Sequence, residues 1–185
     1  FGGITAFTDL VLDAVRDASA STGLGMAVVV AANRTRHPLD ARTLARLAGQ
    51  YAGRGVVGFG LSNDERRGST ADFAPAFRIA ERAGLLLVPH GGELRGPEHI
   101  RLGLDALGAQ RLGHGVRTAE DPALLERVVD AGVVLEVCPV SNVALGVYSD
   151  LTSVPLPTLL DAGAQVALGA DDPLLFGSRL AGQYA

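Results

Sequence analysis

The sequence predicts an α/β protein built on a parallel β-sheet, because apolar runs and helical patterns alternate along the whole chain. The apolar runs are continuous, which is typical of strands that are buried on both faces. They recur at intervals of roughly 20 to 30 residues, which suits one strand plus one helix. With 185 residues and no linker or low-complexity segment, residues 1–185 are expected to form a single domain.

Six strands are expected, each a short run rich in β-branched and other apolar residues. They are Met26–Val30, Gly55–Phe59, Leu85–Val88, Gln110–Gly113, Val133–Val137 and Gln165–Leu168.

Helical patterns precede and separate these runs, and each has a start or a stop signal. They begin at Thr8, Asp40, Thr70, Pro97, Asp121 and Pro155, and glycine ends five of them at Gly23, Gly84, Gly108, Gly132 and Gly163. Proline suits the first turn of a helix, and glycine accepts the left-handed conformation that ends one. The chain is therefore expected to contain six βα units.

Strict alternation fits either a doubly wound sheet or a closed barrel. No glycine-rich phosphate loop follows the first strand, which argues against a dinucleotide-binding sheet. A βα barrel needs eight strands, and six are visible. Because the sequence also opens at Phe1 without an initiator Met, we expect a piece of a longer protein, with two N-terminal strands outside it. Such a piece would expose two sheet edges, and poor solubility or oligomerisation is expected for it in isolation.

Composition excludes several classes of function. The formal net charge is −4 and no basic run occurs, so neither nucleic acid nor a membrane surface is an expected partner. The single cysteine, Cys138, excludes a disulfide framework and a cysteine-rich zinc cluster. No apolar run is long enough to span a bilayer and no signal-peptide pattern opens the sequence, so a cytoplasmic location is expected.

Polar residues gather directly after five of the six expected strands. The clusters are 62–65, 90–93, 114–115, 138–142 and 171–173. Parallel α/β folds carry their sites at the carboxyl ends of their strands. These clusters are therefore expected to form one site.

Two of the clusters pair a histidine with a carboxylate or with glycines. His90 and Glu93 flank Gly91 and Gly92, which suits a metal ligand beside a general acid or base. The alternative is a histidine at the rim that is satisfied by backbone groups. His114 lies between two glycines. An imidazole there could be a metal ligand or could position a metal-bound water, and the alternative is that it has no functional role.

Asp171 and Asp172 are adjacent carboxylates, which persist most easily when a cation or a donor separates them. The alternative is an ordinary helix start before Pro173. The two interpretations are compatible if Asp172 caps the helix while Asp171 faces inward. Cys138 has no glycine elbow or paired histidine in the sequence around it and is expected to be a small core residue. His37 and His99 are expected to face solvent. Four arginines are expected to be surface or rim charges without a specific partner: Arg34, Arg36, Arg66 and Arg67.

Four ordered segments, Pro89–Glu93, Arg111–Gly115, Leu135–Asn142 and Ala167–Pro173, resemble the adenosine deaminase family of the amidohydrolase superfamily. A weaker match at Gly58–Glu65 precedes them. The resemblance covers nearly the whole chain. It implies a (β/α)8 TIM barrel of the metal-dependent hydrolase type, of which this chain supplies the C-terminal part with about six of eight βα units.

The resemblance also implies a hydrolase that acts on the C–N bond of a cyclic amidine, with one zinc ion. The expected reaction is hydrolytic deamination of a 6-aminopurine nucleoside or a related adenine compound. The implied roles are metal ligation by His90 and Asp171, proton transfer to purine N1 by Glu93, orientation and deprotonation of water by His114, a hydrogen bond to N7 from Asp172, and substrate contacts by Gly92 and Asn63.

Departures from the family pattern leave alternatives open. The family's His-x-His pair on the first barrel strand is absent from this sequence, so the chain alone is expected to be inactive. Asn63, Gly169 and Val154 replace residues that are frequent in the family, which affects the substrate more than the reaction. The alternatives are a non-catalytic protein that binds a purine or a partner, a deaminase specific for adenine or a modified nucleoside, and another metal-dependent amidohydrolase. A homo-oligomer is compatible with each.

Overall fold

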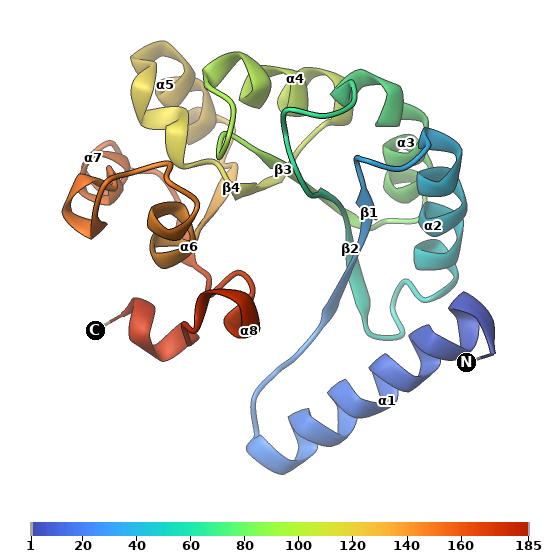
Figure 1. Cartoon of the computed structure of the whole chain (residues 1–185). Coiled ribbons are helices and arrows are strands. Elements are labelled where there is room, and N and C mark those ends of the chain that lie inside the picture. Colours follow the sequence, from blue (N-terminus) through green and yellow to red (C-terminus); the bar gives the residue numbers. More distant parts are fainter. Residues whose placement is uncertain (1, 185) are drawn as a thin grey trace.

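The computed structural model describes residues 2–184 and contains one sheet of six parallel strands. The strands are β1 (Val28–Asn33), β2 (Val56–Ser62), β3 (Leu86–Gly91), β4 (Arg111–His114), β5 (Val134–Val137) and β6 (Val166–Leu168). Their order in the sheet is the same as their order in the sequence. The sheet curves, and helices line its outer side (Figure 1).

Helices connect the strands on that outer side. They are α2 (Pro38–Gln50), α3 (Ala74–Arg82), α4 (Pro97–Leu107), α5 (Pro122–Asp130) and α7 (Leu156–Asp161), while α1 (Gly3–Thr22) precedes β1, and the short α6 (Pro139–Ala144) and α8 (Pro173–Phe176) follow β5 and β6. Four 3₁₀ turns complete the described elements: η1 (Thr70–Phe73), η2 (Val116–Glu120), η3 (Leu151–Ser153) and η4 (Leu180–Gln183).

The strand order decides between the two architectures that the sequence leaves open. In a doubly wound sheet the order reverses at a switch point, so helices cover both faces. Here each strand pairs in parallel with the next one along the chain, without a reversal. Because such crossovers are right-handed, the connecting helices all lie on one face, as in a βα barrel. The chain is thus a six-strand arc of the barrel fold.

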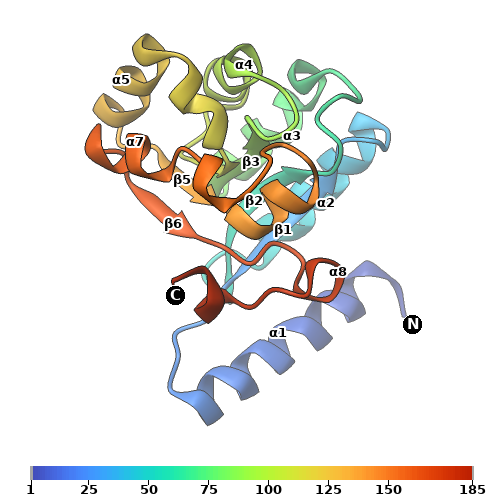
Figure 2. The ribbon, with the colours of Figure 1, turned by 60° about the vertical axis from the view of Figure 1, so that its left-hand side comes forward.

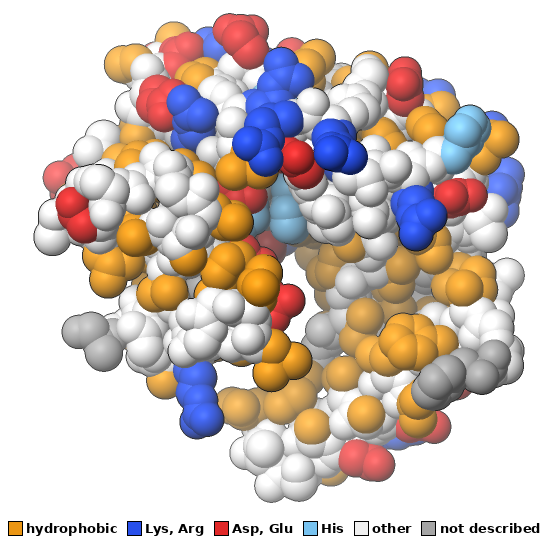
Figure 3. Space-filling view, in the orientation of Figure 1, with side chains coloured by type: hydrophobic (Ala, Val, Ile, Leu, Met, Phe, Trp, Pro, Cys, Tyr) orange, Lys and Arg blue, Asp and Glu red, His pale blue; other side chains and the backbone are white. Residues whose placement is uncertain are grey.

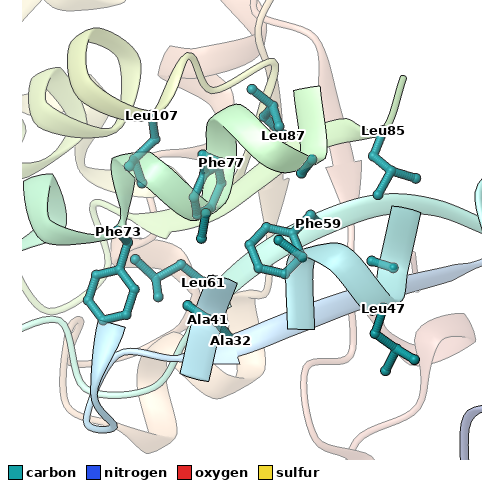
Figure 4. Close-up of a cluster of buried hydrophobic side chains, with 14 of the residues drawn as sticks. Ala32, Ala41, Leu47, Phe59, Leu61, Phe73, Phe77, Leu85, Leu87 and Leu107 are labelled. Carbon is teal, nitrogen blue, oxygen red and sulfur yellow. The ribbon is translucent and has the colours of Figure 1, made fainter. Parts of the chain in front are cut away.

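The core lies between the sheet and its outer helices, in two clusters. One packs β1–β3 against α2 and α3 and includes Phe59 and Phe77, whose rings meet edge to face at 5.2 Å (Figure 4). The other packs β4–β6 against α4, α5 and α7 around Ile100, Leu112 and Leu135. Fully buried aliphatic and aromatic side chains of this kind contribute about 1.5–3 kcal/mol each. This packing fixes the strands whose ends carry the polar residues.

The helix α1 lies beside the arc rather than within its outer layer (Figure 2). It contains no buried residue, and its side chains Ile4, Phe7 and Leu10 are exposed. One contact that fixes it is the hydrogen bond that the Tyr51 hydroxyl donates to Asp9 Oδ1 at 2.6 Å. Among residues 2–184, no helix combines the length and the apolar character that crossing a bilayer requires.

The structure confirms all six expected strands and corrects several boundaries. The first helix begins at Gly3 instead of Thr8, whose hydroxyl donates within the helix to the Ile4 carbonyl at 2.8 Å. The second begins at Pro38 and is capped by His37 rather than by Asp40. Strand β3 continues through Gly91, so His90 lies within the strand and not beyond it. The helix α6 was not expected, since it is too short to show a helical period, whereas α8 begins at Pro173, where a helix start was one of the two interpretations of the sequence.

Candidate active site

Four of the expected site residues converge at the carboxyl ends of the strands. Ligand atoms of Glu93, His114 and Asp171 all lie within 4.8 Å of one another. The ring of His90 meets the ring of His114 edge to face, with centroids 4.8 Å apart. Figure 3 shows histidine and acidic side chains within a hollow near the middle of the molecular face seen in Figure 1. The topology therefore brings β3, β4 and β6 together at one site.

Two adjoining hollows share His90, His114 and Asp171. One, of about 520 Å³, reaches toward the strand-end loops, and its lining also includes Asn63, Glu93, Asp172 and Phe176. The other, of about 410 Å³, extends along β4–β6, where Arg111 Nε donates to Glu136 Oε1 at 2.7 Å. The first hollow contains every expected substrate contact except Gly92, so it is the better candidate for a substrate cavity.

The backbone around the hollow is unusual. Asn63, His114 and Asp171 are the non-glycine residues with positive φ in the described part of the chain, at 81°, 68° and 56°. Such conformations cost of order 1–3 kcal/mol and concentrate at functional sites. Asparagine, at position 63, is one of the residues that accept this conformation best. All three positions lie at strand ends, where a strained turn aims a side chain across the strand mouth.

Glu93 is buried, and its surroundings favour the protonated carboxyl. Burial raises its pKa to about 8, and the negative charges of Glu65 and Asp171 add to the effect. Asn142 Nδ2 donates to Glu93 Oε1 at 3.4 Å and opposes the shift. His114 Nδ1 faces the same oxygen at 3.4 Å. A carboxyl with this pKa can donate a proton at neutral pH.

The two histidines are neutral in this environment. Burial lowers the pKa of His114 to about 3, and His90 beside it lowers it further. Burial likewise lowers the pKa of His90. His114 Nδ1 is buried and has no hydrogen-bond partner among residues 2–184. Zinc is bound by neutral imidazole nitrogens and carboxylate oxygens. The nitrogens of His90 and His114 together with the carboxylate of Asp171 therefore form a donor set that fits a divalent cation such as zinc.

The raised pKa of Glu93 predicts a pH-dependent stability difference. Since the folded-state pKa of about 8 lies above the ordinary value of 4.5, the native state holds an extra proton between these values, and this contribution to stability is lost as the pH rises. In metal-free, full-length protein, Glu93→Gln should gain stability over wild type by up to about 1.4 kcal/mol per pH unit from pH 5 to 8. Urea unfolding at several pH values measures this. A pH-independent difference would contradict it.

The other expected site residues have distinct positions. Asp172 caps α8 through Oδ1, which accepts from the backbone N–H groups of Leu174 and Leu175 at 3.0 Å. Asp171 lines both hollows, so the double role expected for the aspartate pair fits the structure. Gly92 lines neither hollow. It packs against Ile100, and a Cβ added to Gly92 would lie 2.4 Å from Ile100 Cδ1. Cys138 is buried, and burial raises the pKa of its thiol to about 12, which fits the expected core role.

The expectation that Arg34 and His99 face solvent or the rim is wrong. Both are buried, with 1% and 3% of their surface exposed. Strand β1 runs three residues past its expected end, which carries Arg34 to the site. Helix α4 packs against η1 as well as β3, so a second face of the helix, with His99, is covered. His37 is exposed, as expected. Arg66 and Arg67 are exposed, but the expectation that they lack a partner is wrong, since both pair with Asp64, at 2.8 and 3.8 Å.

Sequence reasoning missed Glu65 and Asn142, both fully buried. Each belongs to a polar cluster that the sequence had marked, so position alone was a usable signal. Glu65 accepts hydrogen bonds from backbone N–H groups of the loop that carries Glu93. Burial raises the pKa of Glu65, while those backbone donors and Arg34 lower it.

Comparison with known proteins gives a consistent result. The family model for adenosine deaminase matches residues 3–185. A Streptomyces virginiae protein with the provisional name adenosine/adenine deaminase is 64% identical over 183 residues, which are 99% of this chain and 54% of that protein. An adenine deaminase of Agrobacterium fabrum is 43% identical over 99% of this chain and 56% of its own length.

The structural comparison agrees. The crystal structure of adenine deaminase from Arthrobacter aurescens superposes with a TM-score of 0.84 at 29% identity, covering 93% of this chain and 52% of that one. The chain spans about half the length of the curated relatives it matches. Because the family model covers all but the first two residues, the chain belongs to the adenosine deaminase family.

Proposed function

We propose that the full-length protein containing this chain is a zinc-dependent aminohydrolase that converts a 6-aminopurine and water into the 6-oxopurine and ammonia. The observation that carries the proposal is the convergence of Glu93, His114 and Asp171 within 4.8 Å, at the strand ends of a chain that belongs to this family. The close relatives named for adenine or adenosine support the substrate class.

His90 and Asp171 would hold the zinc ion, together with residues outside this chain. When bound, zinc supplies Lewis-acid activation that makes water nucleophilic at neutral pH. The neutral imidazole of His114, whose Nδ1 has no hydrogen-bond partner among the described residues, orients the attacking water, and with a pKa of about 3 it passes the water proton on rather than holding it.

Glu93 manages the proton on the purine. Its buried carboxyl, protonated at neutral pH, donates to N1 and makes C6 a better electrophile. Water adds to C6, and the C–N bond then breaks as the amine takes one water proton, passed on by His114, and leaves as ammonia. The other water proton returns to Glu93, and the oxygen stays on C6 as the oxo group. Asp172 uses Oδ1 to cap α8 and retains Oδ2 for the N7 edge of the base. Asn63 and Phe176 line the same hollow and would enclose the purine.

The proposal is tested by ammonia release from adenine and from adenosine with full-length, zinc-loaded protein. We expect turnover of at least one of them, with kcat in the usual range of about 1–10³ s⁻¹. Calorimetric binding of the same purines is measured in parallel. Binding without turnover would show that the protein binds purines without deaminating them. The absence of both binding and turnover would overturn the proposed substrate class.

A further inference from the structure

We infer that Glu65 is a positioning residue, which acts through the backbone of the loop that carries Glu93 rather than on the substrate. The inference rests on the proposed role of Glu93 in deamination. It is carried by a set of buried polar contacts that hold both ends of the segment 90–95 and that no step of the proposed reaction uses.

The carboxylate of Glu65 holds the far end of this segment. Its two oxygens accept the Glu93 N–H at 3.2 Å, and Oε2 also accepts the N–H groups of Leu94 at 3.1 Å and Arg95 at 2.9 Å. The side chain is fully buried, so these donors replace the water that would otherwise surround the carboxyl oxygens. Three consecutive backbone donors directed at one carboxylate fix the path of the loop.

Arg34 holds the near end. Its Nη2 donates to the carbonyl oxygen of His90 at 2.9 Å, and its Nη1 donates to Thr70 Oγ1 at 3.2 Å. Arg34 and Glu65 therefore contact the segment on opposite sides of Gly91 and Gly92. Glycines are the residues with the greatest backbone freedom, and the two contacts restrict the pair from both ends.

Thr70 and His99 lie between the side chains of Arg34 and Glu65 that contact the two ends of the segment. Burial lowers the pKa of His99 to about 4, so its ring is neutral at pH 7. Its Nε2 lies 2.8 Å from Thr70 Oγ1 and 3.2 Å from Arg34 Nη1, and a guanidinium can only donate. Nε2 is therefore the acceptor, and the ring proton is on Nδ1. That nitrogen lies 3.5 Å from Glu65 Oε2 but makes no hydrogen bond with a described residue, so the hydrogen-bonded chain runs from Arg34 through Thr70 to His99, whose ring lies beside Glu65.

This arrangement matters for chemistry because proton transfer needs the carboxyl of Glu93 within hydrogen-bond reach of the purine. A displacement of about 1 Å by a remote change can cost roughly 100-fold in rate. Within the described part of the chain, the carboxyl of Glu93 has one side-chain donor, Asn142, at a long 3.4 Å. The position of Glu93 therefore depends mainly on its backbone, which Glu65 holds.

The test is Glu65→Gln in the full-length, zinc-loaded protein. Gln offers one acceptor oxygen and turns an N–H₂ group toward the backbone donors. We expect kcat for deamination to fall roughly 10- to 100-fold with KM changed less than about threefold, because the loop and not the binding surface is displaced. Zinc content should stay at the wild-type stoichiometry, and amide hydrogen exchange of residues 93–95 should quicken at least about tenfold. Glu98→Gln, on an exposed side chain that starts α4, is the matched control and should match wild type in every measurement.

A mutant cycle separates positioning from general stabilisation. In a Glu93→Gln background, Glu65→Gln should cost little further activity, since the group it positions is already lost. If Glu65→Gln folds poorly, Glu65→Asp, which keeps the charge but is one methylene shorter, should show the same faster exchange and a smaller loss of kcat. Additive losses in the cycle, or unchanged exchange at residues 93–95, would overturn the inference. The exchange measurement needs no turnover. It therefore tests whether Glu65 holds the loop even if the proposed reaction is wrong.

Discussion

Replacing Glu93 by Gln is expected to lower kcat for purine deamination by roughly 10²- to 10⁴-fold, the usual contribution of a positioned acid or base. Gln cannot transfer a proton, yet it has almost the same shape and can still accept the hydrogen bond that Asn142 donates. The loss should therefore fall on kcat, with KM changed little. Steady-state kinetics on adenine and adenosine with the full-length, zinc-loaded protein measure both.

The metal content of Glu93→Gln is the decisive companion measurement. Glu93 belongs to the donor cluster with His114 and Asp171, so its geometry alone also fits a ligand. We propose that it carries a proton instead, and zinc should then remain at the wild-type stoichiometry. Loss of zinc together with activity would show that Glu93 ligates the metal. The exposed Glu98→Gln variant controls for the change from carboxylate to amide.

Much of the fold follows from the sequence because its signals are local. Each strand is a continuous apolar run, and most helices have a proline or a capping residue at the start and a glycine after the end. The choice between a doubly wound sheet and a barrel is not local, since both share the same alternation. It was settled by the strand order, in which each strand pairs with the next along the chain.

The site was predictable to the extent that residues follow strand ends. His90, Glu93, His114 and Asp171 meet because parallel strands bring their carboxyl ends to one edge. His99 was misassigned because periodicity assigns a helix one buried face, whereas α4 buries a second face against η1. Arg34 was misassigned because β1 continues to Asn33, past its expected end at Val30. A buried charge is costly unless it is paired, and which partners exist is visible only in three dimensions.

Gly113→Ala is expected to displace the imidazole of His90 and so remove zinc from the site. Gly113 pairs with His90 across β3 and β4, and an added Cβ would lie 2.4 Å from His90 Cδ2 and 3.0 Å from its Nε2. The ring must leave its position or the strands must separate. Displacing a proposed ligand by about 1 Å should lower kcat roughly 100-fold, and overpacking should cost about 1–3 kcal/mol of stability. Zinc titration and urea unfolding of the full-length variant measure both effects.

Gly103→Ala is the matched control, since it adds the same methyl group at another buried glycine, on the helix that packs against the sheet. Gly103 lies inside α4, and a Cβ there would be 3.5 Å from Leu112 Cδ2 and 3.9 Å from Pro89 Cγ, which are ordinary contacts. Alanine favours a helix interior over glycine, so this variant should gain about 0.5–1 kcal/mol and bind zinc normally. If Gly113→Ala also bound zinc with unchanged affinity, His90 would not be a ligand in the position seen here. If the Gly113→Ala variant lost stability but kept zinc, the close fit of the His90 ring against Gly113 would contribute to packing alone.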